Sequence, residues 1–192
     1  MSGLPPFIGP AAPSRYGYVP VYPDGPSNSA LAKPGGQGGN GNIVSGRSDY
    51  HPWIIRRRTT FKEVILQVTT AGTAGTADIG WHANTINNGI WTPGPLLETI
   101  ATGLSLTTPG GRVQSWARTV EAGVYWSQTL ALGLTGGPVV RGTAGCLPFV
   151  PQANANAAHA IGYTESGLSA LANTPNPVLS TQQLASPAFM IN

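Results

Sequence analysis

"FKEVILQVTTAGTAGTADIGWHAN", residues 61–84, decides the fold class because it contains two alternating patterns in succession. Residues 61–70 and 76–84 each alternate apolar side chains with polar or small ones. Successive side chains of a β-strand point to opposite faces, so each segment is predicted as a strand with one buried face. "TAGTAG", residues 70–75, is a glycine-containing connection of hairpin length. The predicted buried faces hold Val64, Leu66, Val68, Ala77, Ile79, Trp81 and Ala83.

Strand-like segments continue along the rest of the chain, at close spacing and separated by turn residues. They lie at residues 111–120, 123–132, 137–142, 157–165 and 188–192, with "EAG" joining the first two. The one helical signal is a turn around "PLLETIA", residues 95–101. Six to eight short strands without a long amphipathic helix predict an antiparallel, jelly-roll-like β-sandwich over residues 51–192.

Residues 1–50 differ from the rest, with eight prolines, ten glycines and no hydrophobic periodicity. Their first half is predicted to be extended and partly polyproline-like, and residues 34–46 to be flexible. Aromatic and branched side chains lie between the prolines, and such an arm can order itself in a groove of another subunit. A disordered tail is the alternative. We expect an anchoring arm over residues 1–50, with anchors at Phe7, Ile8, Tyr16, Tyr18 and Tyr22.

"GQGGNG", residues 36–41, has the G-x-G-x-x-G spacing of a dinucleotide-binding loop. Such a loop needs a buried strand before it and a helix after it, because the helix N-terminus binds the pyrophosphate. Here "ALAKPGG" precedes and "NIVSGRSDYHP" follows, and neither has the required pattern. The motif is therefore interpreted as a hinge.

The composition favours turns and short strands and leaves few charges at the surface. Charged residues make up 9% of the chain, against about 25% in typical soluble domains. The net charge is +3, so a pI near 9.3 reflects scarcity of charge and not a strongly basic surface. Cys146 is the one cysteine, which excludes an intrachain disulfide and fits a reducing compartment. Without a secretory signal or an apolar run of membrane length, we expect a soluble, cytoplasmically made protein.

Several short motifs occur together between residues 50 and 142. They comprise Phe61 after "TT", "VTTAG" at Val68–Gly72, a glycine-turned strand at Ala77–Trp81, a loop with Pro93 and Gly94, and "AGVYW" at Ala122–Trp126. As a set they resemble a β-sandwich module that recurs in virion proteins of tailed bacteriophages. The chain departs from that pattern at Gly80-Trp81-His82, where such modules more often carry charged residues.

The resemblance implies an architectural or host-contacting role, as a head decoration protein, a head or tail fibre, or a spike. Proteins of this kind are commonly trimeric. The resemblance implies no catalytic residue, and it makes Pro93, Gly94, Tyr125 and Trp126 fold-forming positions only.

No set of nucleophile, base and orienting group is recognisable in the sequence. His51, His82 and His159 lie far apart, and Cys146 forms no metal-binding pair with them. The carboxylates lie in or beside turns, with no spacing that favours a glycosidase pair. We expect no enzymatic activity, cofactor or metal, and a phage-associated hydrolase is kept as an alternative.

Arg56, Arg57 and Arg58 form the one charge cluster, with Lys62 close by. On a strand, alternation sends Arg57 to one face and its two neighbours to the other, so the three would form no continuous phosphate stripe. Intersubunit or edge-protecting arginines are therefore favoured over a nucleic-acid site.

The five tryptophans divide into two groups. Trp81 and Trp126 have apolar neighbours on predicted strands and are expected to fill the core. Trp91 lies in a Gly- and Pro-containing loop beside Asn87 and Asn88, and it is the best candidate for an exposed ring. An exposed ring with amides beside it could bind a sugar, while loop packing or a subunit contact is the alternative reading of Trp91.

These observations together predict a non-enzymatic structural protein of a phage virion, assembled in the host cytoplasm. Its arm would bind other capsid or tail proteins, and its sandwich would pack with copies of itself as a homotrimer. Capsid decoration is favoured over a fibre, because the chain is short. The alternative is a tail-fibre or spike adhesin that recognises a host surface glycan. Membrane and nucleic-acid partners are not expected.

Overall fold

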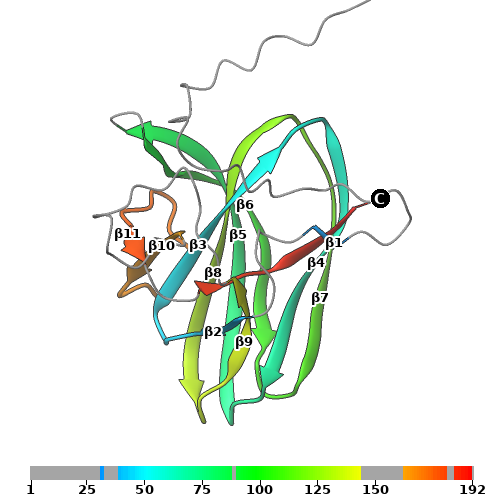
Figure 1. The fold of residues 1–192 in the computed structure, drawn as a ribbon. Helices are drawn as coiled ribbons and strands as arrows, with labels where there is room; N and C mark the ends of the chain where they lie inside the picture. The colour runs from blue at the N-terminus through cyan, green and yellow to red at the C-terminus, as the bar shows by residue number, and fades with distance from the viewer. Residues whose placement is uncertain (1–30, 33–38, 88–89, 144–161, 181–183, 192) are drawn as a thin grey trace, which may run out of the picture.

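The computed structural model describes residues 31–32, 39–87, 90–143, 162–180 and 184–191 (Figure 1). The described residues form strands and their connections, with no helix among them. Accordingly, this part of the chain contains no helix with the length and hydropathy needed to cross a bilayer. The five predicted arm anchors lie outside the described residues.

The strands form two antiparallel sheets that pack face to face, which confirms the predicted β-sandwich. The first sheet contains β1 (Leu31–Ala32), β2 (Gly39–Asn42), β4 (Thr59–Thr70), β7 (Gly110–Val120), β9 (Val139–Thr143), β12 (Leu184–Ala185) and β13 (Ala188–Ile191). The second sheet has the order β11-β10-β3-β8-β5-β6. Its strands are β3 (Arg47–Ile55), β5 (Ala74–Asn87), β6 (Ile90–Ser105), β8 (Gly123–Thr135), β10 (Gly162–Ser166) and β11 (Val178–Ser180).

Eight of these strands form four nested antiparallel pairs. β5 pairs with β6, β4 with β7, β3 with β8, and β2 with β9. In each pair, the residue numbers of two opposing residues add up to between 177 and 181. The nearly constant sum means that the four pairs belong to one long hairpin, in which the chain reverses once near residues 87–90. Antiparallel pairing of β4 with β9 joins two of these pairs side by side in the first sheet, and pairing of β5 with β8 does the same in the second sheet. This rolled-up hairpin is the jelly-roll arrangement that the sequence predicted.

The predicted faces of the first two strands are confirmed in β4, where Val64, Leu66 and Val68 are buried and alternate with more exposed residues. In β5, Ala77, Ile79 and Trp81 are buried as predicted. His82, which the pattern placed on an outward face, is also fully buried, because the outer face of the second sheet carries a cluster of buried side chains, among them Tyr50 against the His82 ring.

Two local predictions were wrong. Residues 70–75 do not form a hairpin, because β4 and β5 belong to different sheets and the segment crosses between them. Residues 95–101 do not form a helical turn but lie within β6, which pairs with β5 through several bulges. Pairing with β5 gives the main-chain N–H and C=O groups of this segment their hydrogen-bond partners, and this outweighs the weak local helical preference.

The predicted boundary at residue 50 was also wrong. β1 and β2 lie within residues 1–50, and β3 begins at Arg47. Gly39–Gly41, the second half of the "GQGGNG" motif, belongs to β2 and not to a hinge. Glycine is needed there for close packing, because a Cβ on Gly41 would lie 2.8 Å from the Ala185 Cα atom. A Cβ on its neighbour Gly142 would lie 2.4 Å from the Leu184 carbonyl oxygen.

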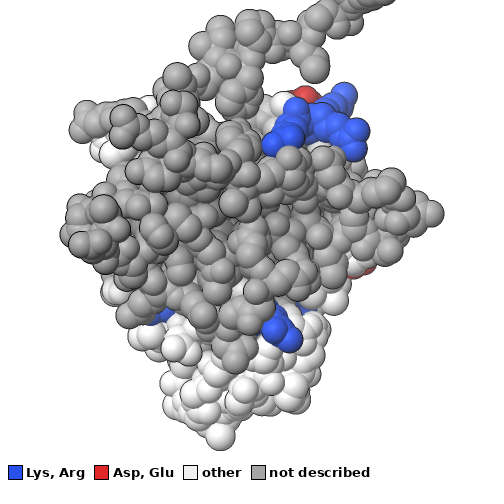
Figure 2. Space-filling view, in the orientation of Figure 1, with Lys and Arg blue, Asp and Glu red and all other residues white. Residues whose placement is uncertain are grey.

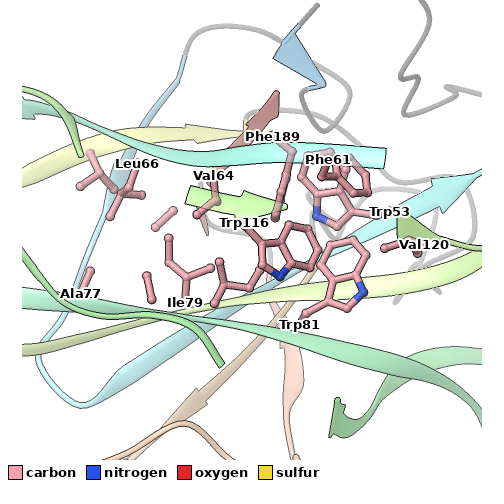
Figure 3. Packing of buried hydrophobic residues seen from close by; sticks show 14 of the residues in the cluster. Trp53, Phe61, Val64, Leu66, Ala77, Ile79, Trp81, Trp116, Val120 and Phe189 are labelled. Carbon is pink, nitrogen blue, oxygen red and sulfur yellow. The ribbon is translucent and has the colours of Figure 1, made fainter. Parts of the chain in front are cut away.

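The core between the sheets is built around aromatic rings, which Figure 3 shows gathered at one end, with Val64, Leu66, Ala77 and Ile79 toward the other. Trp81 lies at the centre of the aromatic group. Its ring centroid is 6.3 Å from that of Trp53, 6.1 Å from Phe61, 5.3 Å from Trp116, 5.4 Å from Tyr125 and 5.4 Å from Phe189. These rings come from both sheets, so Trp81 joins the two layers.

Candidate functional site

A second apolar cluster covers the outer face of the second sheet. It contains Tyr50, Ile54, Trp91, Trp126 and Tyr163, with Val124 packed against it. Trp91 is only 8% exposed, so the expected exposed ring is absent and this part of the glycan prediction was wrong. Its main-chain carbonyl accepts a hydrogen bond of 3.1 Å from the Tyr163 hydroxyl, which ties β6 to β10. Trp126 is buried as predicted, but in this outer cluster and not between the sheets.

Of the two amides predicted beside Trp91, only Asn87 belongs to the described residues. Asn87 is exposed and pairs with Ile90 at the end of the β5–β6 hairpin, which projects beyond the sheet at the upper left of Figure 1. Asn88 lies outside the described residues. The exposed amide therefore has no exposed tryptophan ring beside it with which to hold a sugar.

A chain of polar side chains runs beneath the outer cluster, across β3, β8 and β5. The Gln128 side chain contacts the Ser48 hydroxyl at 2.6 Å and the His82 Nε2 atom at 2.8 Å. The His82 Nδ1 atom lies 2.9 Å from the Gly94 carbonyl oxygen. All three side chains are fully buried, so the chain links three strands and the start of β6 without a solvent contact.

His82 is neutral in this environment, because burial lowers its pKa. Since a carbonyl oxygen can only accept, Nδ1 carries the proton and donates to Gly94. Nε2 must then accept. The structure places the Gln128 Oε1 atom beside the ring and its Nε2 atom toward the Ser48 hydroxyl, so the amide has to be exchanged end for end to complete both bonds. The imidazole thus has both nitrogens occupied by structural bonds, and this arrangement supports strand alignment.

Tyr50 extends the same region toward the surface. Its hydroxyl donates to a Glu165 carboxylate oxygen at 2.8 Å, and its ring meets the His82 ring edge-on at 5.6 Å. Burial raises the pKa of Tyr50 and the carboxylate adds to that effect, so the phenol remains protonated. This bond holds β10 against β3, the strand with which it pairs.

The inner face of the second sheet carries a separate polar group beside the C-terminal strands. A buried Asp49 carboxylate accepts one hydrogen bond of 2.7 Å from the Ala185 amide and pairs at 3.0 Å with the Arg47 Nε atom. Burial raises the pKa of Asp49 to about 6, although Arg47 and the Ala185 amide act in the opposite direction. Asp49 therefore attaches β12 to β3, at the cost of burying a charge.

His51 lies two residues further along the same face and is fully buried. Its ring lies against the main chain of Leu184 and Ala185, but neither nitrogen is placed for a good hydrogen bond. Burial lowers the pKa of His51 to about 4, so the ring is neutral near pH 7.

Asp49, His51 and Ser127 do not form a usable catalytic triad in this geometry. Ser127 lies opposite His51 in the β3–β8 register, but its hydroxyl accepts a hydrogen bond of 2.9 Å from the Trp53 indole. All three side chains are enclosed between the sheets, so a reactant would have to open the sandwich to reach them. Among the residues that the structure describes, no three His, Cys, Asp or Glu side chains form a group that could hold a metal ion. Cys146 and His159 lie outside that part of the chain.

Arg56, Arg57 and Arg58 form the connection between β3 and β4, so the predicted strand alternation among them was wrong. All three are exposed. The Arg58 Nε atom lies 3.2 Å from a carboxylate oxygen of Glu121, which follows β7. The cluster thus sits on a turn at one end of the sandwich and not on a sheet edge.

Four of the six exposed large apolar side chains among the described residues lie on outer strands, whereas Val44 lies in the β2–β3 connection and Ile86 on β5. Leu97 lies on β6, Val113 on β7, and Val178 and Leu179 on β11. Val178 is 67% exposed and Leu179 is 42% exposed, and β11 carries no charged residue. Sequence reasoning missed this strand. The signal was weak, since "VLS" is a three-residue apolar-to-polar run between "NTPNP" and a polar segment.

No known protein family and no curated protein matches this chain.

Proposed function

We propose that the protein is a non-enzymatic structural protein of a phage virion that acts by associating with copies of itself and with other particle proteins. The observation that carries the proposal is the composition of β11. This three-residue strand ends the second sheet in the described part of the chain, and it exposes two apolar side chains without a charge.

An edge strand of this kind favours association for two physical reasons. In the described part of the chain no further strand pairs with β11, so the sheet can extend there into a neighbouring chain, and monomeric proteins usually protect such edges with charged side chains. Burial of Val178 and Leu179 adds a hydrophobic contribution, and little charge has to be dehydrated on a surface with 9% charged residues. Homotrimers with β11 at the subunit contact are the expected assembly.

The fold supports the proposal by analogy. Jelly rolls occur in viral capsid proteins but also in lectins and cupins, so the fold alone does not decide the function. The resemblance of residues 50–142 to phage sandwich modules favours the first of these classes. The glycan-binding alternative gains no support, because Trp91 is buried. We place the protein on the particle as a decoration protein or a fibre, assembled in the host cytoplasm.

Placing lysines at both exposed positions of β11, Val178→Lys with Leu179→Lys, is expected to abolish self-association. The added charges would repel their counterparts on the neighbouring subunit and would be costly to bury. Light scattering coupled to size-exclusion chromatography should change from a trimer mass to a monomer mass, with an unchanged far-ultraviolet circular dichroism spectrum. Val44→Lys is the matched control, since Val44 is 50% exposed but lies in the β2–β3 connection. A monomeric wild type over the full concentration range would refute the proposal.

Deletion of residues 1–30 tests the arm separately. The deletion keeps β1 and β2, so the truncated chain is expected to fold and to self-associate like the full chain. It should be absent from purified virions when it is produced in place of the full-length protein, because the predicted anchors are gone. Circular dichroism and particle cofractionation measure the two outcomes. Incorporation at wild-type levels would exclude an anchoring role for this segment.

A further inference from the structure

Positive charge is concentrated at one end of the molecule. The described residues include eight Lys and Arg, and four of them, Arg56, Arg57, Arg58 and Lys62, lie within seven consecutive positions. Figure 2 shows Lys and Arg side chains gathered at the upper right, with few Asp or Glu around them. On a surface with so few charges elsewhere, this turn dominates the local electric field.

The turn is held in a fixed place by the strands on either side. Ile55 pairs with Gly123 and Thr59 pairs with Val120, so the Arg56–Arg58 turn lies beside the short connection between β7 and β8. That connection contributes one carboxylate, Glu121, against three guanidinium groups. The three guanidinium groups and this carboxylate together carry a net charge of +2.

We infer that the turn formed by Arg56, Arg57 and Arg58 binds a cluster of carboxylates on the surface of a partner protein. This inference rests on the proposed assembly function and adds the chemistry of one contact to it. Arginine suits the role, because its planar guanidinium group pairs with carboxylates through two parallel hydrogen bonds.

The Arg58–Glu121 pair shows that the turn can accept a carboxylate. Both side chains are largely exposed, 72% for Arg58 and 70% for Glu121. Pairs of this kind are screened by water, so Glu121 can give up its place to a carboxylate that a partner brings into a less hydrated contact. Glu121 therefore acts as an internal competitor for the same site.

The surroundings favour an acidic protein over nucleic acid. Single-stranded nucleic acid is held by stacking on exposed aromatic rings, and all five tryptophans are buried. The described residues include no helix that could enter a groove. Three consecutive residues on a turn form a compact cluster, whereas a nucleic-acid backbone is tracked by an extended basic groove.

Binding of a fluorescent peptide of consecutive glutamates to the isolated full-length chain tests the inference. The peptide is expected to bind in a salt-dependent way, and each of Arg56→Gln, Arg57→Gln and Arg58→Gln should weaken it by about three- to tenfold. Arg141→Gln is the matched control, since it removes one exposed cation from β9 and should leave the affinity unchanged. Glu121→Gln should tighten binding, because it removes the competing carboxylate.

Three outcomes would overturn the inference: equal weakening by Arg141→Gln, no tightening by Glu121→Gln, or tighter binding of oligothymidylate of the same formal charge. The last result would favour nucleic acid as the partner. Because the peptide assay does not require self-association, it can fail while the β11 variants still support assembly, and the reverse also holds.

Discussion

Trp81→Ala is expected to lower the free energy of unfolding by about 3–5 kcal/mol. Trp81 is 3% exposed and contacts aromatic rings of both sheets, with Phe61 in the first sheet and Trp53 and Tyr125 in the second. Its removal would leave a cavity between layers that cannot collapse without moving strands. Urea denaturation followed by circular dichroism measures the loss.

Two further variants, Trp81→Phe and Ile86→Ala, test whether the loss of stability comes from removing the buried ring. Phenylalanine keeps an aromatic ring in place and should recover more than half of the lost stability. Ile86 is 53% exposed near the end of β5, so its truncation should cost no more than about 0.5 kcal/mol. A loss of less than about 1 kcal/mol for Trp81→Ala would mean that the aromatic group does not hold the two sheets together.

The second large effect concerns the pH dependence of stability, in which Asp49 and His51 act in opposite directions. The pKa of His51 falls from 6.5 to about 4 on folding, so its contribution is present above pH 6.5 and is lost as the pH falls toward 4. The pKa of Asp49 rises from 3.8 to about 6 on folding. The contribution of Asp49 to the free energy of unfolding therefore increases as the pH falls from about 6 to 3.8. Each contribution reaches about 3 kcal/mol, and the two largely cancel in the wild type.

The two single substitutions should therefore change the slope of the free energy of unfolding against pH in opposite directions. Asp49→Asn removes the compensating group, so stability should fall by about 3 kcal/mol between pH 6.5 and 4. His51→Gln should make stability rise on acidification, reduced by His82, whose lowered pKa acts in the same direction as that of His51. Urea midpoints at several pH values give both slopes.

The double variant Asp49→Asn with His51→Gln serves as the control, since it should regain a slope close to that of the wild type. Identical slopes in all four proteins would show that neither group titrates as its burial implies. Because the Asp49→Asn substitution leaves Arg47 without its carboxylate, the comparison uses slopes and not absolute stabilities.

Much of the sandwich could be predicted from local alternation. Val64, Leu66 and Val68 were placed on the correct face, because one side of β4 is buried and the other is not. The same reasoning failed for His82, since the second sheet is covered on both faces and alternation of burial disappears there. It failed again for residues 95–101, where pairing with β5 decides the conformation and local preference does not.

The buried polar groups could not be found from the sequence, because their partners are distant along the chain. Gln128 meets Ser48 and His82, and Asp49 meets the main chain of Ala185. None of these pairs has a recognisable spacing, and each depends on which strands become neighbours. The exposure of Val178 was missed for a related reason: position at the end of a sheet is a property of topology.

The nested pairing sets the order in which the molecule can form. The innermost pair joins Asn87 to Ile90, whereas the outermost joins Gly39 to Gly142. Closing a short loop costs less entropy than closing a long one, so zippering outward from the central hairpin is the least costly route. During synthesis, β2 must wait until β9 has left the ribosome. A nascent chain interrupted before that point would retain an open edge, which makes the last third of the sequence the stage at which aggregation must be avoided.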